Sequence, residues 1–88
     1  MNYMKDELIS NLHNIADVLY KGATNQGIAY MGNVIPAISV MADKIDDNLR
    51  TELAENILTP ILEAMSAKDG TLLADLITYE LIEFIEKQ

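Results

Sequence analysis

The stretch that decides the fold is residues 4–21, MKDELISNLHNIADVLYK. When its residues are placed at about 100° each, the apolar and polar side chains separate onto opposite sides of a helix. Lys21 and Gly22 then supply the cation and the glycine with which many helices end. The apolar side consists of Met4, Leu8, Ile9, Leu12, Ile15, Ala16, Leu19 and Tyr20. The stretch therefore predicts an amphipathic helix.

The rest of the chain has the same helical character. Apolar residues keep helical spacing over three further segments, residues 25–45, 48–67 and 70–87. The alternating β-branched runs that indicate strands are absent. Polar turns separate the segments, and either Asp69 or Thr71 can cap the last one. The sequence predicts an all-α fold, a single helical domain over residues 1–88, arranged as a four-helix antiparallel bundle with proline kinks.

Two prolines interrupt the predicted helices. Pro36 lies where the apolar spacing does not slip, so a kink near Gly32 fits the pattern better than a break. Thr59 and Pro60 could be the N-cap and the first residue of a new helix, because proline is favoured in a first helical turn. A break of the third helix at Pro60 is therefore nearly as well supported as a kink. Small residues on the outer side of the 25–45 segment would let another helix approach closely. They are Ala29, Gly32, Ala37 and Ser39.

Composition excludes several classes of function. The chain has 88 residues and a formal net charge of −8, with six Lys and Arg against fourteen Asp and Glu. This balance argues against binding to nucleic acid or anionic membranes, whose phosphates attract cationic proteins. The absence of cysteine excludes disulfides and thiolate metal sites. Because Lys5 is followed at once by Asp6 and Glu7, and the uncharged stretch 22–42 is too polar to be inserted in a membrane, we expect a cytoplasmic protein.

The C-terminal segment carries a family resemblance. Residues 68–83 read KDGTLLADLITYELIE, and this LLADLxxYEL-like ending resembles that of small acidic helical proteins of Gram-positive bacteria, whose function is uncharacterised. The stretch GIAYMG at 27–32 resembles their second helix. The sequence departs from the pattern at Gly70, where an aromatic residue is more usual, and at Glu83, where a proline is common. The resemblance implies a helical fold, with no known activity and no catalytic residue.

No constellation of residues predicts catalysis. His13, the single histidine, has Asp17 one turn later and Asp6 two turns earlier, a pattern more typical of a boundary residue than of a general base. Di-metal bundles need Glu-x-x-His from two helices, and this pattern is lacking. Residues 43–47 lack the glycine and the alternating ligands of a calcium loop. We therefore expect no catalytic residue, no metal and no cofactor.

Acidic rows lie beside the apolar sides of the last two predicted helices. They consist of Glu52, Glu55 and Glu63 on the third, and Asp75, Glu83 and Glu86 on the fourth. Such rows are typical of a solvated face that keeps a protein in solution. The alternative is an acidic strip that steers a basic partner or peptide toward the protein.

The fourth predicted helix is more apolar than one amphipathic face requires. Ile82 lies outside its apolar arc, whereas Glu80 lies inside the arc. A carboxylate there must be paired, for which Arg50 and Lys68 are candidates, have a raised pKa, or lie at the edge of an interface. Either the bundle is compact enough to surround the apolar excess, or a second chain covers it, and we expect a homodimer. The candidate interface residues are Leu76, Tyr79, Glu80, Ile82 and Phe84.

These features predict a non-enzymatic helical module for protein–protein interaction, an adaptor or assembly partner that binds a protein or peptide client. Two alternatives stay open. One is an export or flagellar-type chaperone that holds a client helix. The other is a small metal-dependent or regulatory enzyme that uses His13 and nearby carboxylates, and metal analysis with a His13→Ala variant would separate it from a binding module.

Overall fold

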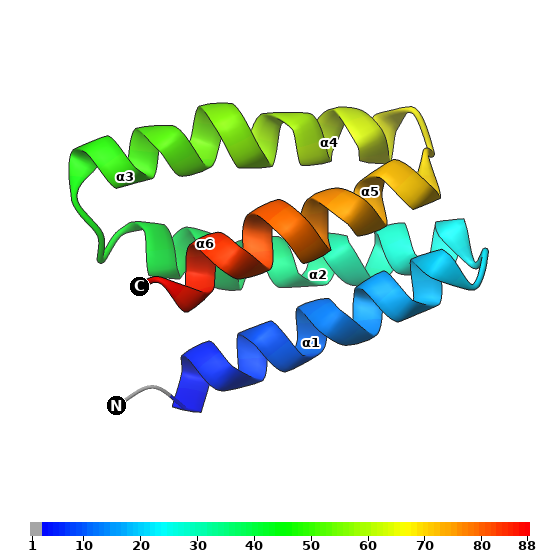
Figure 1. Cartoon of the computed structure of the whole chain (residues 1–88), viewed down its shortest axis with the longest axis horizontal. Coiled ribbons are helices and arrows are strands. Elements are labelled where there is room, and N and C mark those ends of the chain that lie inside the picture. Colours follow the sequence, from blue (N-terminus) through cyan, green and yellow to red (C-terminus); the bar gives the residue numbers. More distant parts are fainter. Residues whose placement is uncertain (1–2) are drawn as a thin grey trace.

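The computed structural model describes residues 3–88, which form four helices joined by short turns (Figure 1). The first two are α1 (Tyr3–Tyr20) and α2 (Thr24–Ala42). The third helix runs unbroken through α3 (Asp47–Glu52), η1 (Leu53–Leu58) and α4 (Thr59–Ser66). The fourth helix runs through α5 (Gly70–Leu76), η2 (Ile77–Leu81) and α6 (Ile82–Glu86), and η marks a π-helical stretch. Met1 and Asn2, at the N-terminus that we considered as a possible targeting segment, lie outside the described residues.

The four helices alternate in direction and enclose one core. In Figure 1 the fourth helix crosses in front, between α1 and the third helix, and it contacts both. The helix α2 packs mainly against α1 and also contacts α5. The largest fully buried side chains come from all four helices: Leu12, Met31, Ile38, Leu53, Ile61, Leu73, Ile77, Leu81 and Ile85. The predicted all-α, four-helix fold is confirmed, with helix ends that differ from the predicted ones by a few residues.

Glycine and aspartate residues set the turns between the helices. Gly22 ends α1 with a φ of 92°, a left-handed conformation that glycine adopts at little cost. The carboxylates of Asp46 and Asp69 each accept a hydrogen bond from the backbone N–H three residues later, at 2.9 and 3.1 Å. These bonds satisfy N–H groups that have no partner within the helix. Asp69, rather than Thr71, therefore caps the fourth helix.

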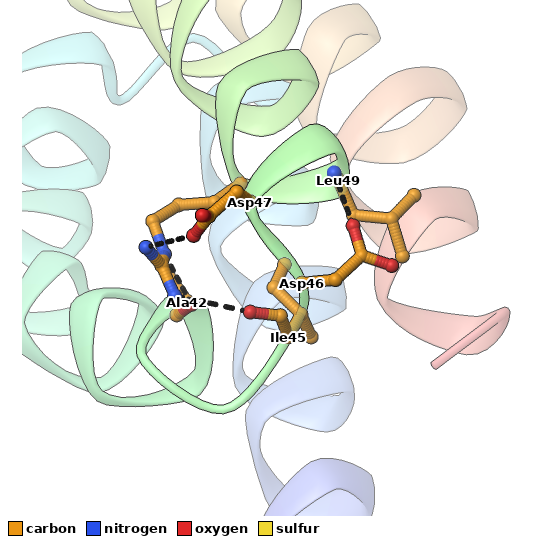
Figure 2. A network of polar contacts seen from close by, with 6 residues as sticks. Ala42, Ile45, Asp46, Asp47 and Leu49 are labelled. Carbon is orange, nitrogen blue, oxygen red and sulfur yellow. Dashed lines mark hydrogen bonds and ion pairs between the residues drawn. The ribbon is translucent and has the colours of Figure 1, made fainter.

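A single arginine joins the end of α2 to the start of α3 (Figure 2). The Arg50 guanidinium donates hydrogen bonds to the carbonyl oxygens of Ala42 at 3.0 Å and Ile45 at 3.1 Å, and to the Asp47 carboxylate at 2.9 Å. The two carbonyl groups lie at and just beyond the end of α2, where helical partners are lacking. The guanidinium thus fixes the connection between two helices, and it does not pair with Glu80.

Neither proline breaks its helix. The helix α2 continues through Pro36, which is exposed. Pro60 lies in the first turn of α4, directly after the π-helical stretch η1. There the Thr59 N–H donates to the Ala54 carbonyl five residues back, and the Thr59 hydroxyl donates to the same oxygen at 2.9 Å. A π turn is wider than an α turn, so it relieves the clash between a proline ring and the preceding turn. The break considered at Pro60 therefore does not occur.

Candidate functional site

An open groove of about 380 Å³ lies between the third and fourth helices. Its floor is apolar, because Ile57 and Phe84 line it and are themselves only 5% and 6% exposed. Leu49, which is half-buried, extends this apolar surface toward the start of α3. These side chains are held by the core of the bundle, so the floor is fixed by packing.

Both π-helical stretches contribute residues to the lining of this groove. Ile57 lies in η1, while Tyr79 and Glu80 lie in η2, and the two stretches contact one another. A π turn has i→i+5 hydrogen bonds and so holds about one residue more than an α turn, which changes the direction of the side chains that follow. The direction of the side chains that line the groove thus depends on the π turns, and it would differ in a regular α-helix.

Carboxylates surround the apolar floor. Glu52 lies on the third helix, and Glu80 and Glu83 lie on the fourth. Among residues 3–88 no ion pair or side-chain hydrogen bond engages these three carboxylates, since the one ion pair there joins Arg50 to Asp47. Lys87 supplies the single cationic side chain of the lining. The groove therefore combines an apolar floor with an acidic rim.

Tyr79 stands at the edge of the groove with 61% of its surface exposed. It is the most exposed of the large apolar and aromatic residues in the described chain. Aromatic rings beside a pocket are the side chains that contribute most often to binding energy at protein interfaces. The ring is therefore placed to contact whatever occupies the groove.

Three of the five predicted interface residues come together in this groove: Tyr79, Glu80 and Phe84. Leu76 is half-buried and lies outside the lining. Ile82 is only 2% exposed and belongs to the core of its own chain. The expectation that Ile82 adds to the apolar surplus on the surface is therefore wrong.

The π-helical stretch η2 explains where the helical wheel fails. A wheel drawn at about 100° per residue assumes α geometry throughout. The additional residue in the π turn rotates the following side chains back toward the core, which brings Ile82 inward. Glu80, within this stretch, is exposed. Glu80 consequently needs no buried partner, and within residues 3–88 neither Arg50 nor Lys68 forms an ion pair with it.

The sequence did not single out the third-helix side of the groove. Glu52 and Glu83 were assigned to separate acidic rows, and the structure brings both to the rim of one cavity. Leu49 and Ile57 have the helical spacing of apolar residues in the 48–67 segment, and they lie at the open edge of the core. The acidic rows were the only sequence signal for the third-helix side of this groove, and they did not show that the two helices face each other there.

A second polar feature ties α1 to α5 outside the groove. The Tyr20 hydroxyl donates a hydrogen bond to the Asp75 carboxylate at 2.6 Å. This bond raises the pKa of the Tyr20 phenol above its ordinary value of 10.0, because loss of the proton would leave two negative charges side by side. The pair is exposed, so its main effect is to align the two helices.

His13 lies exposed on α1, away from the groove. Across residues 3–88, no three His, Asp or Glu side chains gather in a group that could hold a metal ion. Of the helices in this part of the chain, none is both long and apolar enough to cross a bilayer. The groove is the candidate site because an exposed aromatic ring and carboxylates border its apolar floor.

A family model described as "Domain of unknown function (DUF8042)" matches residues 1–87. The chain belongs to this family. No curated protein and no solved structure matches it significantly. The match covers almost the whole chain, so the coarser expectation of a family without a known function is confirmed.

The groove of this DUF8042 protein offers two kinds of interaction. Its floor can remove an apolar side chain from water, which is the main source of free energy in protein association. Its rim can attract and orient cationic groups, which affects the rate and selectivity of association more than affinity. Neither interaction requires a reacting group.

Proposed function

We propose that this DUF8042 protein is a non-enzymatic helical module for protein–protein interaction, an adaptor or assembly partner that binds a protein or peptide client. The groove between the third and fourth helices is the observation that supports this function. Phe84 and Ile57 form an apolar floor beneath the opening of the groove, and the exposed ring of Tyr79 stands beside it. An aromatic anchor next to a fixed apolar pocket is the usual centre of a protein interface.

Two further expectations from the sequence stay part of this proposal. One is a cytoplasmic location. The other is the likeness to small acidic helical proteins of Gram-positive bacteria, which rests on the C-terminal LLADLxxYEL-like ending. Fractionation of the native cell checks the location, and recovery of the protein with the membrane or outside the cell would contradict it.

We also propose that two copies of the chain associate through the outer side of α2. None of the 19 residues of α2 is charged, although the chain carries a formal net charge of −8. The outer side is exposed and includes Ala29, Gly32, Pro36, Ala37 and Val40. Because charged groups are costly to bury without partners, an uncharged side is where two acidic chains can approach with the least penalty.

Photo-crosslinking in the native cell tests the interaction module. A photoreactive residue in place of Tyr79 is expected to capture one dominant partner, because this ring borders the groove. The same residue in place of His13, which is exposed on α1, is the matched control. Capture of the same proteins at both positions, or of none at Tyr79, would refute a groove-directed module. A captured export or flagellar protein would narrow the function to a chaperone.

Sedimentation tests self-association. At micromolar concentration we expect a mass of about twice 9.8 kDa. Ala37→Glu should reduce this mass to that of one chain, because each copy would place a carboxylate in the contact. Thr51→Glu adds the same charge at an exposed position of α3 and should leave the mass unchanged. Ile82→Glu is unsuitable for this purpose, because Ile82 is in the core. A monomeric wild-type protein would contradict the dimer.

A further inference from the structure

We propose that the occupant of the groove is a basic amphipathic helix, with one large apolar side chain on the floor and Lys or Arg side chains against the rim. This inference rests on the proposed function, because it takes the groove to be the binding site. It adds the chemistry of the partner, for which the apolar floor, the distribution of carboxylates and the helical walls each give an argument.

The floor selects an apolar anchor. Ile57 and Phe84 are almost fully buried, so they present a fixed surface that cannot reshape around a polar group. A volume of about 380 Å³ is near the lower end of the range of roughly 300–1,000 Å³ found for ligand pockets. It holds large side chains but not a helix backbone. The partner's backbone must therefore lie along the opening and insert its side chains.

The rim selects positive charge on both sides of that anchor. Glu52 borders the groove on the third helix, while Glu80 and Glu83 border it on the fourth. These carboxylates have no ion pair within residues 3–88, so a bound cation would not have to displace an internal partner. An acidic segment would meet like charges from both walls and from a chain of net charge −8. Charge of this kind steers association and rejects unsuitable partners.

The walls favour a helical partner over an extended one. One common way of binding an extended peptide adds it as a strand to an open sheet edge, and residues 3–88 contain no strand. Two helices with an apolar cleft between them present the surface into which amphipathic helices dock, through apolar residues spaced three, four and seven positions apart. Cations on both flanks of such an apolar stripe would meet the two acidic walls.

Binding of designed peptides tests this chemistry. The first probe is a fluorescein-labelled peptide of about fifteen residues, near the minimum for a helix in water, with Leu at helical spacing and Lys on both flanks. The second has Glu in place of every Lys, and the third has Ser in place of every Leu. Fluorescence anisotropy should show binding of the first peptide to the full-length protein and at least about tenfold weaker binding of the other two, because each lacks one of the required interactions.

Variants of the protein locate the binding. The triple substitution Glu52→Gln, Glu80→Gln and Glu83→Gln should weaken binding of the first peptide on the order of tenfold, with a smaller effect at high salt. Glu63→Gln, at an exposed position of α4 outside the groove, should leave binding unchanged. These are conservative changes at exposed positions, and the melting temperature and circular dichroism of each variant check its folding.

Three results would overturn the inference. They are equal binding of the acidic peptide, no effect of the triple substitution, and no binding of the basic peptide at millimolar concentration. Each is distinct from failure of the proposed function. If the partner captured at Tyr79 bound through an acidic or an extended segment, the proposed interaction module would be supported, but a basic helix would be excluded as its client.

Discussion

Two glycines in α2 allow a direct test of how closely this helix packs on α1. Gly27 is buried, and a Cβ built there would lie 2.6 Å from the Cγ of Leu19, which is itself only 2% exposed. Carbon atoms need about 3.5–4.0 Å, so α1 and α2 would have to separate or Leu19 would have to leave its rotamer. Gly32 lies in the same helix, and a Cβ there would meet no described atom within 4 Å. The same substitution by alanine therefore meets a close contact at Gly27 and open space at Gly32.

The expected free energies of unfolding follow from this difference. Replacing glycine by alanine within a helix favours folding by about 0.5–1 kcal/mol. Overpacking of a core opposes it by about 1–3 kcal/mol. Gly32→Ala should therefore stabilise the protein by about 0.5–1 kcal/mol, whereas Gly27→Ala should destabilise it by about 0–2.5 kcal/mol. The difference between the variants isolates the packing cost, because the helix-propensity contribution is common to both.

Urea denaturation followed by circular dichroism measures this difference, and thermal unfolding should show about 4–8 °C for each kcal/mol. Gly32 lies on the side of α2 through which we propose self-association, and self-association makes the measured stability depend on protein concentration. The denaturation curves should therefore be recorded at two protein concentrations. If Gly27→Ala were as stable as Gly32→Ala at both concentrations, the close contact between Gly27 and Leu19 would be refuted.

Three further changes test other contacts. Arg50→Lys keeps the charge but loses the planar set of donors, so we expect a loss of about 1–2 kcal/mol in urea denaturation; the wild-type midpoint would contradict the bridge between α2 and α3. Asp75→Asn should lower the pKa of Tyr20 toward 10.0 in NMR of the tyrosine ring, and an unchanged titration would exclude the hydrogen bond. Because the folded pKa of Tyr20 is raised, this bond's stabilising effect is present below pH 10.0 and is lost as the pH rises through the folded pKa. His13→Ala should leave the stability within about 0.5 kcal/mol and the captured partner unchanged, and metal retained by the wild type but lost by the variant would support the enzyme alternative.

The helices and most of their ends could be predicted from the sequence, because local interactions set them. Residues 4–21 show the apolar spacing of one helix, and the structure has α1 over Tyr3–Tyr20. Gly22 and Asp69 were identified as turn and capping residues, and they act as such. A cap satisfies backbone groups within a few residues of itself, so its effect is visible without knowing the rest of the fold.

In the second half of the chain, the sequence did not predict correctly which side chains point into the core and which point to solvent. Leu62 belongs to the apolar spacing of the 48–67 segment and yet is 51% exposed. Glu80, inside the apolar arc of the helical wheel, is exposed, and Ile82, outside that arc, is buried. Each of these residues lies after or within a π-helical stretch. The η1 stretch precedes Pro60, but nothing local marks η2. Such a turn persists where the packing of neighbouring helices stabilises it.

Four helices, the apolar and polar sides of the first, and an acidic chain with an apolar surplus all follow from local sequence patterns. Where that surplus is exposed depends on how the helices pack. This packing placed Ile82 in the core, left α2 uncovered on its uncharged side, and brought Glu52 opposite Glu83 across an apolar floor. The physical reason is that hydrogen bonding and capping act within one turn, whereas a groove depends on how two helices distant in sequence pack against each other.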